Sequence, residues 1–350
     1  MRHSIWTMLV LAITAGASMA PRCYAQDSKG PATEESIESL RQRAEKGDAD
    51  AQSRLGKMYS EGTGVARDEV EGTRWYRKAA EQGDIMGEFQ TASAYMQGRG
   101  VARDPAEAAH WLFRVAEQAE FLAGDVDTTL ESAVASVLTG LYAGGTGVGQ
   151  DTVRAVMWGA IATARAKDKN QVRLPLLHAT PEQMTEGGRL AKTWIQAVRG
   201  DVKAQTDLGL VYSAEKGAAH DYEEAARWFK RAADQGDAQA QYALALAYSS
   251  GEGVPHDDAD AVRWLRRAAD QGHCTAQSYL GLSYYTGKGL ARDNVQALTW
   301  GFIAASKCTG DDKKQVDDFV ELVGSKVTPA QRDEAGRRAK AWKPREEEKR

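Results

Sequence analysis

The chain has 350 residues, of which 42% are hydrophobic and 27% are charged, and its formal net charge is -4. This composition supplies enough apolar surface to bury a core. Acidic and basic residues are mixed along the chain, which argues against a nucleic-acid-binding protein.

Residues 1–25 are expected to form an export signal. A basic start precedes an apolar run over residues 5–17, which is too short to span a bilayer comfortably. The favoured cleavage site follows Ala25, and Cys23 lacks the preceding residues of a lipoprotein box. An uncleaved anchor is the alternative. We expect a periplasmic or secreted protein with no stable membrane insertion after signal cleavage.

Residues 26–46 follow as a polar linker and an N-terminal capping helix. Leu40 and Ala44 occupy the positions that Tyr76 and Ala80 hold one repeat period later. The segment is therefore predicted to be the second helix of a hairpin whose first helix is missing. Such a half-unit would shield the first complete hairpin, as the ends of a stacked repeat array require.

A unit of 36 residues then recurs along the chain. Units begin at Gly47, Gly83, Gly200, Gly236 and Gly272, and a further copy covers residues 130–165 after an insertion over residues 119–129. In the unit from Gly236, an apolar residue recurs every fourth position at Ala240, Leu244 and Tyr248, which places them on one helical face. Periodic units of this length are typical of stacked helical repeats.

Three residue types mark every copy of the unit. A tyrosine ends the first helix, an aspartate caps the second helix, and a tryptophan follows within the second helix. The aspartates of four copies have a capping-box partner three residues later. The tyrosines are Tyr59, Tyr95, Tyr142, Tyr212, Tyr248 and Tyr284; the aspartates are Asp68, Asp104, Asp151, Asp221, Asp257 and Asp293; the tryptophans are Trp75, Trp111, Trp158, Trp228, Trp264 and Trp300; and the partners are Glu71, Glu107, Glu224 and Gln296.

From Leu55 the unit reads Leu-Gly-x-x-Tyr-x-x-Gly-x-Gly-Val-x-x-Asp, and it continues from Trp75 as Trp-x-x-x-Ala-Ala-x-x-Gly. These motifs resemble the Sel-one-like repeat (SLR) family, which is related to the tetratricopeptide repeats. The resemblance covers nearly all of residues 47–308. It implies an all-α fold, a right-handed α/α superhelical solenoid of stacked helix-turn-helix hairpins, and a role in protein–protein interaction.

A second, longer repetition divides the chain into two halves. Thr180-Pro181-x-Gln183 recurs as Thr328-Pro329-x-Gln331, and each copy leads to a tryptophan, Trp194 or Trp342. Threonine before proline is a typical helix start. We expect three hairpins and a closing helical segment in residues 47–199 and again in residues 200–342, followed by a solvated charged tail over residues 343–350.

No motif in the sequence predicts a metal ion or a cofactor. The histidines His110, His178, His220, His256 and His273 lack metal-ligand spacing and are expected to face solvent. Residues 145–149 are glycine-rich but lack the lysine of a phosphate-binding loop.

One motif allows an enzymatic alternative. Ser213 and Lys216 match the Ser-x-x-Lys of penicillin-reactive serine enzymes, although the companion motifs are absent. Some cysteine-rich secreted members of the resembled family are associated with β-lactam binding and β-lactamase activity. We favour a non-catalytic scaffold with no catalytic residues and keep the β-lactamase-like enzyme as the alternative.

Two cysteines, Cys274 and Cys308, remain after signal removal. They open the first helix and close the second helix of the sixth hairpin, and antiparallel helices bring such ends together. Since an exported protein meets an oxidising compartment, a disulfide is one expectation. Two separate buried thiols are the other.

The partner, a protein or peptide, is expected to bind in the groove lined by the first helices of the hairpins. Positions on a second face of these helices hold apolar residues, most regularly in residues 200–342. The alternative is that these residues only pack neighbouring first helices together. The candidates are Phe89, Met96, Leu210, Tyr242, Leu246, Leu282 and Tyr285.

Overall fold

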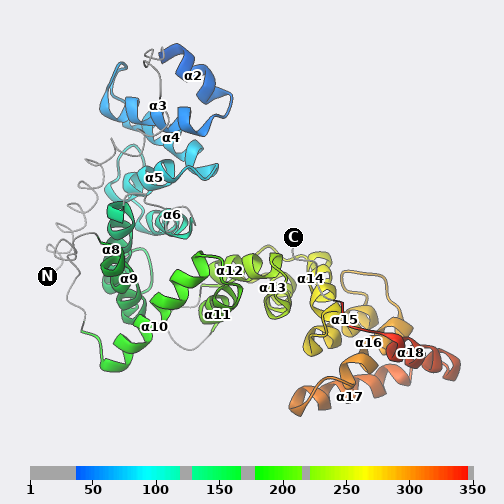
Figure 1. Ribbon diagram of the computed structural model, residues 1–350. Helices are drawn as coiled ribbons and strands as arrows, with labels where there is room; N and C mark the ends of the chain where they lie inside the picture. The colour runs from blue at the N-terminus through cyan, green and yellow to red at the C-terminus, as the bar shows by residue number, and fades with distance from the viewer. Residues whose placement is uncertain (1–36, 119–127, 167–177, 215–220, 346–350) are drawn as a thin grey trace. The chain divides into compact units, whose positions relative to one another are not determined.

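A computed structural model describes residues 37–118, 128–166, 178–214 and 221–345 (Figure 1). The predicted export signal, the linker, most of the insertion over residues 119–129, and Lys216 and His220 lie outside these ranges. The described residues form sixteen α-helices and no strand. Among these helices, none is long and apolar enough to cross a membrane. The chain divides into two compact units, Met1–Arg199 and Gly200–Arg350.

The first unit is a series of antiparallel hairpins that begins with a single helix. The hairpins are α3–α4, α5–α6 and α8–α9, and α10 closes the series. The helices are α2 (Ile37–Glu45), α3 (Ala49–Glu61), α4 (Glu69–Glu81), α5 (Ile85–Gln97), α6 (Pro105–Glu117), α8 (Thr128–Gly144), α9 (Thr152–Arg165) and α10 (Pro181–Val198).

The second unit repeats this plan with hairpins α11–α12, α13–α14 and α15–α16. Two further helices, α17 and α18, both pack against α16. The helices are α11 (Val202–Ser213), α12 (Tyr222–Asp234), α13 (Ala238–Ser250), α14 (Asp258–Asp270), α15 (Cys274–Thr286), α16 (Asn294–Ala305), α17 (Gly310–Gly324) and α18 (Pro329–Ala341). The predicted all-α class of stacked hairpins is confirmed.

The predicted capping helix is α2. Leu40 and Ala44 are buried in one cluster with Ala51, Leu55 and Trp75 of the first hairpin. The half-unit therefore covers the apolar end of the series, as the alignment of Leu40 and Ala44 with a second helix predicts.

Aspartate side chains cap the second helices as predicted. Asp257, for example, accepts hydrogen bonds from the backbone amides of Ala259 and Asp260 at 2.8 and 2.9 Å. A complete capping box also needs the glutamate side chain to accept a hydrogen bond from the aspartate amide, and Glu71 and Glu224 do not form this bond. Glu71 bonds to Arg74 at 3.0 Å, and Glu224 pairs with Arg227. At these two residues an arginine three positions later on the same helix face is a charged partner, and it is favoured over the neutral amide of the cap. Glu107 and Gln296 have His110 and Thr299 at that position, so this reason does not apply to them.

Complete capping boxes form instead at the closing helices. Thr180 caps α10 and Thr328 caps α18, and in each case the glutamine at the third helical position bonds back to the threonine amide at 2.8 Å. The threonine–proline motif therefore starts a helix in both units, as predicted.

The turns of several hairpins touch the hairpin before them, among them the turns of α13–α14 and α15–α16. Gly253 has a φ of 75°, and a Cβ atom at this residue would overlap the carbonyl of Tyr222 at the start of α12. Gly289 meets Asp258 at the start of α14 in the same way. Only glycine satisfies both the left-handed backbone and the close approach, so the second glycine of the turn sets how closely hairpins stack.

At the end of each unit, a tryptophan of the closing segment packs against the tryptophan of the last repeat. Trp194 of α10 packs edge-on against Trp158 with ring centroids 5.0 Å apart, and Trp342 packs against Trp300 at 6.1 Å. The tail that follows Trp342 is not wholly solvated as expected, because the Arg345 amide donates to the Asp270 carbonyl at 2.8 Å. The chain thus folds back over the end of α14.

Candidate partner-binding surface

Two of the predicted partner-binding residues are core residues. Phe89 and Met96 of α5 are only 3% and 2% exposed. Eight of the thirteen residues of α5 are buried, against four in each of α13 and α15. A side chain enclosed on every side cannot contact a partner, so the prediction for Phe89 and Met96 is wrong.

The leucines of the second unit are placed differently. Leu210 of α11 and Leu282 of α15 are each 44% exposed, and Leu246 of α13 is half-buried. The three residues occupy the same position of successive repeats, and we call them the leucine row. Each first helix in the second unit therefore carries one leucine at the equivalent position of its repeat.

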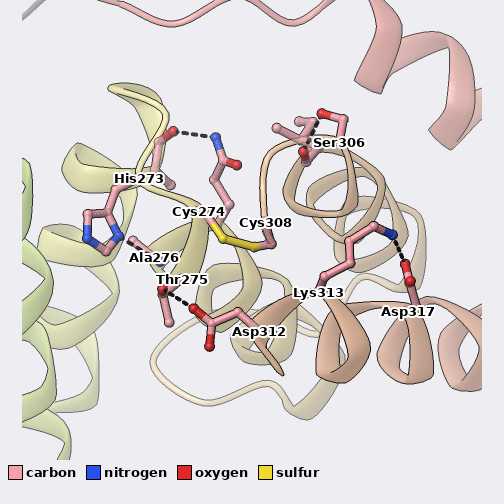
Figure 2. The surroundings of a disulfide bond; sticks show 12 residues. His273, Cys274, Thr275, Ala276, Ser306, Cys308, Asp312, Lys313 and Asp317 are labelled. Carbon is pink, nitrogen blue, oxygen red and sulfur yellow. Dashed lines mark hydrogen bonds and ion pairs between the residues drawn. A yellow bond between two sulfur atoms is a disulfide. The ribbon is translucent and has the colours of Figure 1, made fainter. Parts of the chain in front are cut away.

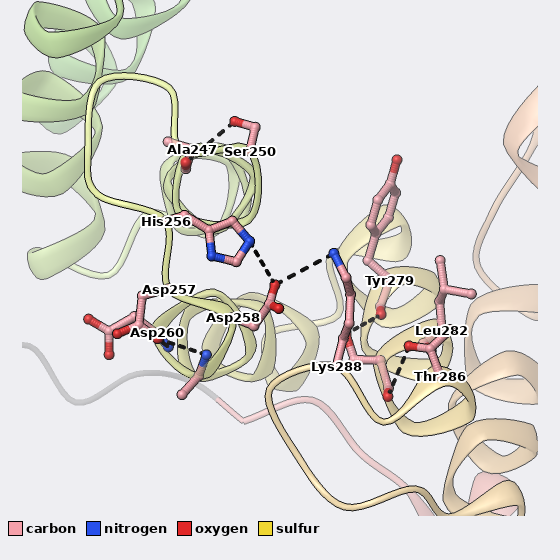
Figure 3. Close-up of polar contacts among 12 residues, drawn as sticks. Ala247, Ser250, His256, Asp257, Asp258, Asp260, Tyr279, Leu282, Thr286 and Lys288 are labelled. Atoms are coloured by element: carbon pink, nitrogen blue, oxygen red, sulfur yellow. Dashed lines mark hydrogen bonds and ion pairs between the residues drawn. The ribbon is translucent and has the colours of Figure 1, made fainter.

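Tyr279 extends this apolar surface, although the sequence analysis did not select it. The side chain is 41% exposed and lies one helical turn before Leu282. Figure 3 shows both side chains leaving α15 on the same side. The signal that would have found Tyr279 is the three-residue spacing to Leu282, which places both on one face.

The two predicted tyrosines pack between neighbouring helices. Tyr242 of α13 stacks on His273 with ring centroids 5.0 Å apart and meets Tyr279 edge-on at 5.7 Å. Burial is the main cause that raises the pKa of Tyr242 above its usual value. Tyr285 meets Phe319 of α17 edge-on at 6.2 Å. The contacts of Tyr242 and Tyr285 therefore agree with the alternative in which these residues pack helices together.

The position of Tyr242 serves the same purpose in other repeats. Thr206, its equivalent in α11, donates to Asp237 at 3.0 Å, and Ser53 in α3 donates to Asp84. Each of these partners is the residue that caps the next first helix. Side chains at this position therefore link successive first helices, and the leucine row is not needed for that link.

His273 is not a solvent-facing histidine, contrary to the prediction. It caps α15 where Asp48, Asp84, Asp201 and Asp237 cap α3, α5, α11 and α13. Its Nδ1 accepts from the Ala276 amide at 3.2 Å, and its Nε2 lies 3.0 Å from the Gln239 Oε1. Because Nδ1 accepts, the ring is neutral and Nε2 donates. Burial lowers the pKa of His273, which favours this neutral form.

A disulfide joins Cys274 to Cys308 beside this histidine (Figure 2). Their Cα atoms are 5.4 Å apart, and 34 positions separate them in the chain. The bridge ties the start of α15 to the segment between α16 and α17. Thr275 also bonds to Asp312 of α17 at 3.4 Å. The end of α15 that follows His273 is thus held by two neighbouring elements.

Charge is segregated between the two kinds of helix in this region. The helices α13 and α15 contain no Asp, Glu, Lys or Arg, whereas α14 between them carries three aspartates and three arginines. On α13 and α15 the polar groups that accompany the apolar residues are hydroxyls and amides. On these two helices the surface suits contacts that need apolar area and neutral hydrogen bonds. On α11 it differs, because Asp207, three residues before Leu210, is ion-paired with Lys203 at 2.8 Å.

Buried glutamines form a polar connection that the sequence analysis missed. Gln241 donates to the Ala233 carbonyl of the preceding second helix at 3.1 Å and accepts from Gln271 at 2.8 Å. Gln52, Gln205 and Gln277 occupy the equivalent position. In α5 the position holds Glu88, which is ion-paired with Arg114 at 2.9 Å. Burial raises the pKa of Glu88 to about 7.

The candidate catalytic serine has a local structural contact. Ser213 ends α11, and its Oγ donates to the Leu210 carbonyl at 3.2 Å. Lys216 lies outside the described residues. Across residues 37–118, 128–166, 178–214 and 221–345, no group of three or more His, Cys, Asp or Glu side chains is placed to hold a metal ion.

Comparison with known proteins identifies the repeats. The family model of the Sel1 repeat matches six segments, residues 49–84, 85–119, 134–165, 202–237, 238–273 and 275–307, which together exceed half of the chain. This finding confirms the resemblance seen in the motifs. A search of curated proteins returned no match.

Solved structures of Sel1-repeat proteins are also similar to this chain. The protective antigen c5321 of uropathogenic Escherichia coli, which displays an SLR fold, is 26% identical, with a TM-score of 0.40, over 87% of this chain and 78% of that one. A Sel1 repeat protein from Oxalobacter formigenes is 21% identical (TM-score 0.31; 82% and 90% covered). A Sel1 repeat protein from Klebsiella pneumoniae subsp. pneumoniae is 17% identical (TM-score 0.22; 83% and 100% covered).

Proposed function

Because the chain belongs to the Sel1-repeat family, we propose that it is a non-catalytic interaction scaffold that binds a partner protein or peptide. The proposed contact surface is the leucine row together with Tyr279. We place this protein in the periplasm, or outside the cell, because of the signal-like residues 1–25 and the disulfide between Cys274 and Cys308.

The exposure of the leucine row carries this proposal. Tyr242 and Thr206 already link successive first helices sideways, so the hairpins do not need Leu210 or Leu282 for stacking. An apolar side chain that recurs in register and stays exposed costs solvation without adding to the core. Leucine and tyrosine placed together on a surface are suitable anchors for a partner.

Substitution of the exposed leucines tests the proposal. Leu210→Ser and Leu282→Ser are combined in one variant, and Val70→Ser is the control because Val70 is 65% exposed on α4 of the first unit. Proteins captured from a periplasmic extract by the wild type are expected to bind the control and to be lost from the double variant, with melting temperatures unchanged. Undiminished capture by the double variant, or a melting temperature lowered by several degrees, would contradict the proposal.

A nitrocefin assay tests the enzymatic alternative. We expect no turnover by the purified protein, because the sequence lacks the companion motifs of penicillin-reactive serine enzymes. Turnover that Ser213→Ala abolishes would replace the scaffold with a β-lactam-hydrolysing enzyme.

A further inference from the structure

We infer that the partner segment bound by the second unit is basic as well as apolar, with an arginine or lysine side chain that lies over Tyr279 and faces the carboxylates of α17. The inference rests on the proposed function and names the chemistry of the partner. Three observations carry it: the position of α17 beside α15, the carboxylates that α17 exposes, and the exposed ring of Tyr279.

The helix α17 extends the series of first helices in the second unit. It begins one repeat period after α15 and packs against α16, as α15 packs against α14. Two contacts along its length join it to α15. Asp312 accepts a hydrogen bond from Thr275 at 3.4 Å (Figure 2), and farther along Phe319 meets Tyr285 edge-on. The helix α17 therefore lies beside α15 where the first helix of a next repeat would lie.

The charge of the surface changes at α17. This helix contains five acidic and two basic residues, whereas α13 and α15 contain no charged residue. One of the two lysines is ion-paired with Asp317. Asp318 stands one repeat period after Leu282, so a carboxylate takes the place of the leucine. Asp311, Asp318 and Glu321 are exposed, and none of the three is ion-paired within the part of the chain that the structure describes. Negative charge at this end of the leucine row is therefore available to a partner.

Tyr279 lies where an approaching cation meets both an aromatic ring and this negative charge. Its side chain is 41% exposed, and ammonium and guanidinium groups are attracted to the face of a tyrosine ring. Tyr279 contacts Tyr242 edge-on, and the charge of Asp312 acts on Tyr242 by adding to the effect of burial, which raises its pKa. His273, which stacks on Tyr242, is neutral and does not cancel the carboxylates.

The opposite end of the leucine row selects no charge. On α11, Lys203 and Asp207 pair with each other at 2.8 Å close to Leu210, so they neutralise each other. The apolar part of the partner is therefore assigned to Leu210 and Leu246, and its basic residue to the end nearest α17. An acidic partner residue at that end would bring like charges together, which is unfavourable.

Fluorescence anisotropy with synthetic peptides tests the inference on the purified full chain. Three labelled leucine-containing peptides of equal length differ only at the same few positions, which hold arginine, citrulline or glutamate. Citrulline keeps the shape of arginine without its charge. The arginine peptide is expected to bind about tenfold more tightly than the citrulline peptide at low salt. This advantage is expected to shrink as the salt concentration rises, because the carboxylates of α17 are exposed.

Two sets of variants locate the charge effect. Asp312→Asn/Asp318→Asn is expected to bind the arginine peptide about fivefold more weakly. Glu223→Gln/Asp333→Asn is the matched control, since it changes the net charge equally at exposed residues of α12 and α18, and it is expected to bind like the wild type.

Tyr279→Leu keeps an apolar side chain and removes the ring. It is expected to weaken binding of the arginine peptide about threefold and to leave binding of the citrulline peptide unchanged.

Each other outcome overturns the inference. Equal or tighter binding of the citrulline or glutamate peptide would remove the basic residue from the partner and leave the scaffold function in place. Equal weakening in the control variant would assign the effect to the net charge of the chain instead of α17. If no peptide binds, the basic assignment fails, and the capture experiment with Leu210→Ser/Leu282→Ser decides separately whether the leucine row binds a partner.

Discussion

Glu88 and Arg114 form an ion pair across 2.9 Å inside the second hairpin, with the Glu88 side chain fully buried. Arg114 also donates to the Ala80 carbonyl at 3.0 Å, and Gln118 donates to Glu88 at 2.8 Å. Despite these partners, burial raises the pKa of Glu88 to about 7. The cost of removing the carboxylate from water therefore exceeds what its partners return.

The raised pKa predicts a pH dependence of stability. Between about pH 4.5 and pH 7 the folded chain binds a proton at Glu88 more readily than the unfolded chain does, so the free energy of unfolding falls as the pH rises through this window. Glu131, which is ion-paired with Arg165 at 3.4 Å, adds to the same trend because burial also raises its pKa to about 7.

Glu88→Gln should weaken this dependence. Glutamine stands at the equivalent position in α3, α11, α13 and α15, so its amide fits the site and needs no charge. Thermal melts at pH 5.5 and pH 8 are expected to show the variant gaining stability over the wild type at pH 8 only. Glu252→Gln, at an exposed residue, is the control. A larger loss at pH 8 than at pH 5.5 would show that the ion pair is net stabilising.

The disulfide predicts a redox-dependent stability of the second unit. In the chain-entropy model, closing a loop of 34 residues stabilises by about 4 kcal/mol. The double variant Cys274→Ser/Cys308→Ser should therefore melt at a clearly lower temperature than the oxidised wild type. Free-thiol titration of the denatured, unreduced wild type should detect neither cysteine. Reaction of both cysteines would show that the exported protein carries two separate thiols.

His273 predicts a loss of stability on the acid side. Its pKa is lowered, so the stabilisation from the neutral ring is present above the unfolded value near 6.5 and is lost as the pH falls. The charged groups that raise this pKa against burial are Asp237 and Asp312. His273→Asp, which restores the cap of the other first helices, is expected to flatten the decline of melting temperature between pH 7 and pH 5.

His273→Ala separates capping from packing in the same experiment. Loss of a helix cap costs about 1 kcal/mol, and the alanine variant also loses the stacking partner of Tyr242. It should therefore melt below the wild type at pH 7, where the ring is neutral. An aspartate variant that follows the same acid decline as the wild type would assign that decline to other groups.

The tryptophans of the two closing segments make a matched pair of substitutions. Trp194 is 1% exposed against Trp158, whereas Trp342 remains half-buried against Trp300. Truncation of a fully buried tryptophan costs about 3–5 kcal/mol. Trp194→Ala is expected to lower the unfolding free energy by this amount, and Trp342→Ala by less. Equal losses in denaturant unfolding would contradict the difference in burial.

The periodicity of the sequence predicted the hairpins because every copy repeats the same tyrosine, aspartate and tryptophan. It did not predict α17, which follows the last repeat and has no copy elsewhere in the described chain. Register also failed to show that Phe89 is a core residue. Phe89 shares its position in the repeat with Tyr242, but neighbouring elements enclose α5 more completely than α13.

His273 was misread for a related reason. The sequence analysis judged it by residue type, whereas its position in the repeat is that of a helix cap. The glutamine connections depend on how closely successive helices approach, as with Gln241 and the Ala233 carbonyl eight positions before it. A pattern within one helix carries no information on that distance.

The central claim is that the leucine row contacts a partner, and site-specific photo-cross-linking in intact cells tests it most directly. A photoreactive amino acid is placed at Leu210, Tyr279, Leu282 or, as the control, Val70. The account predicts the same cross-linked partner at the first three positions and none at Val70, since Val70 lies outside the proposed surface. Adducts that are absent at Leu210 and Leu282, or equally frequent at Val70, would contradict it.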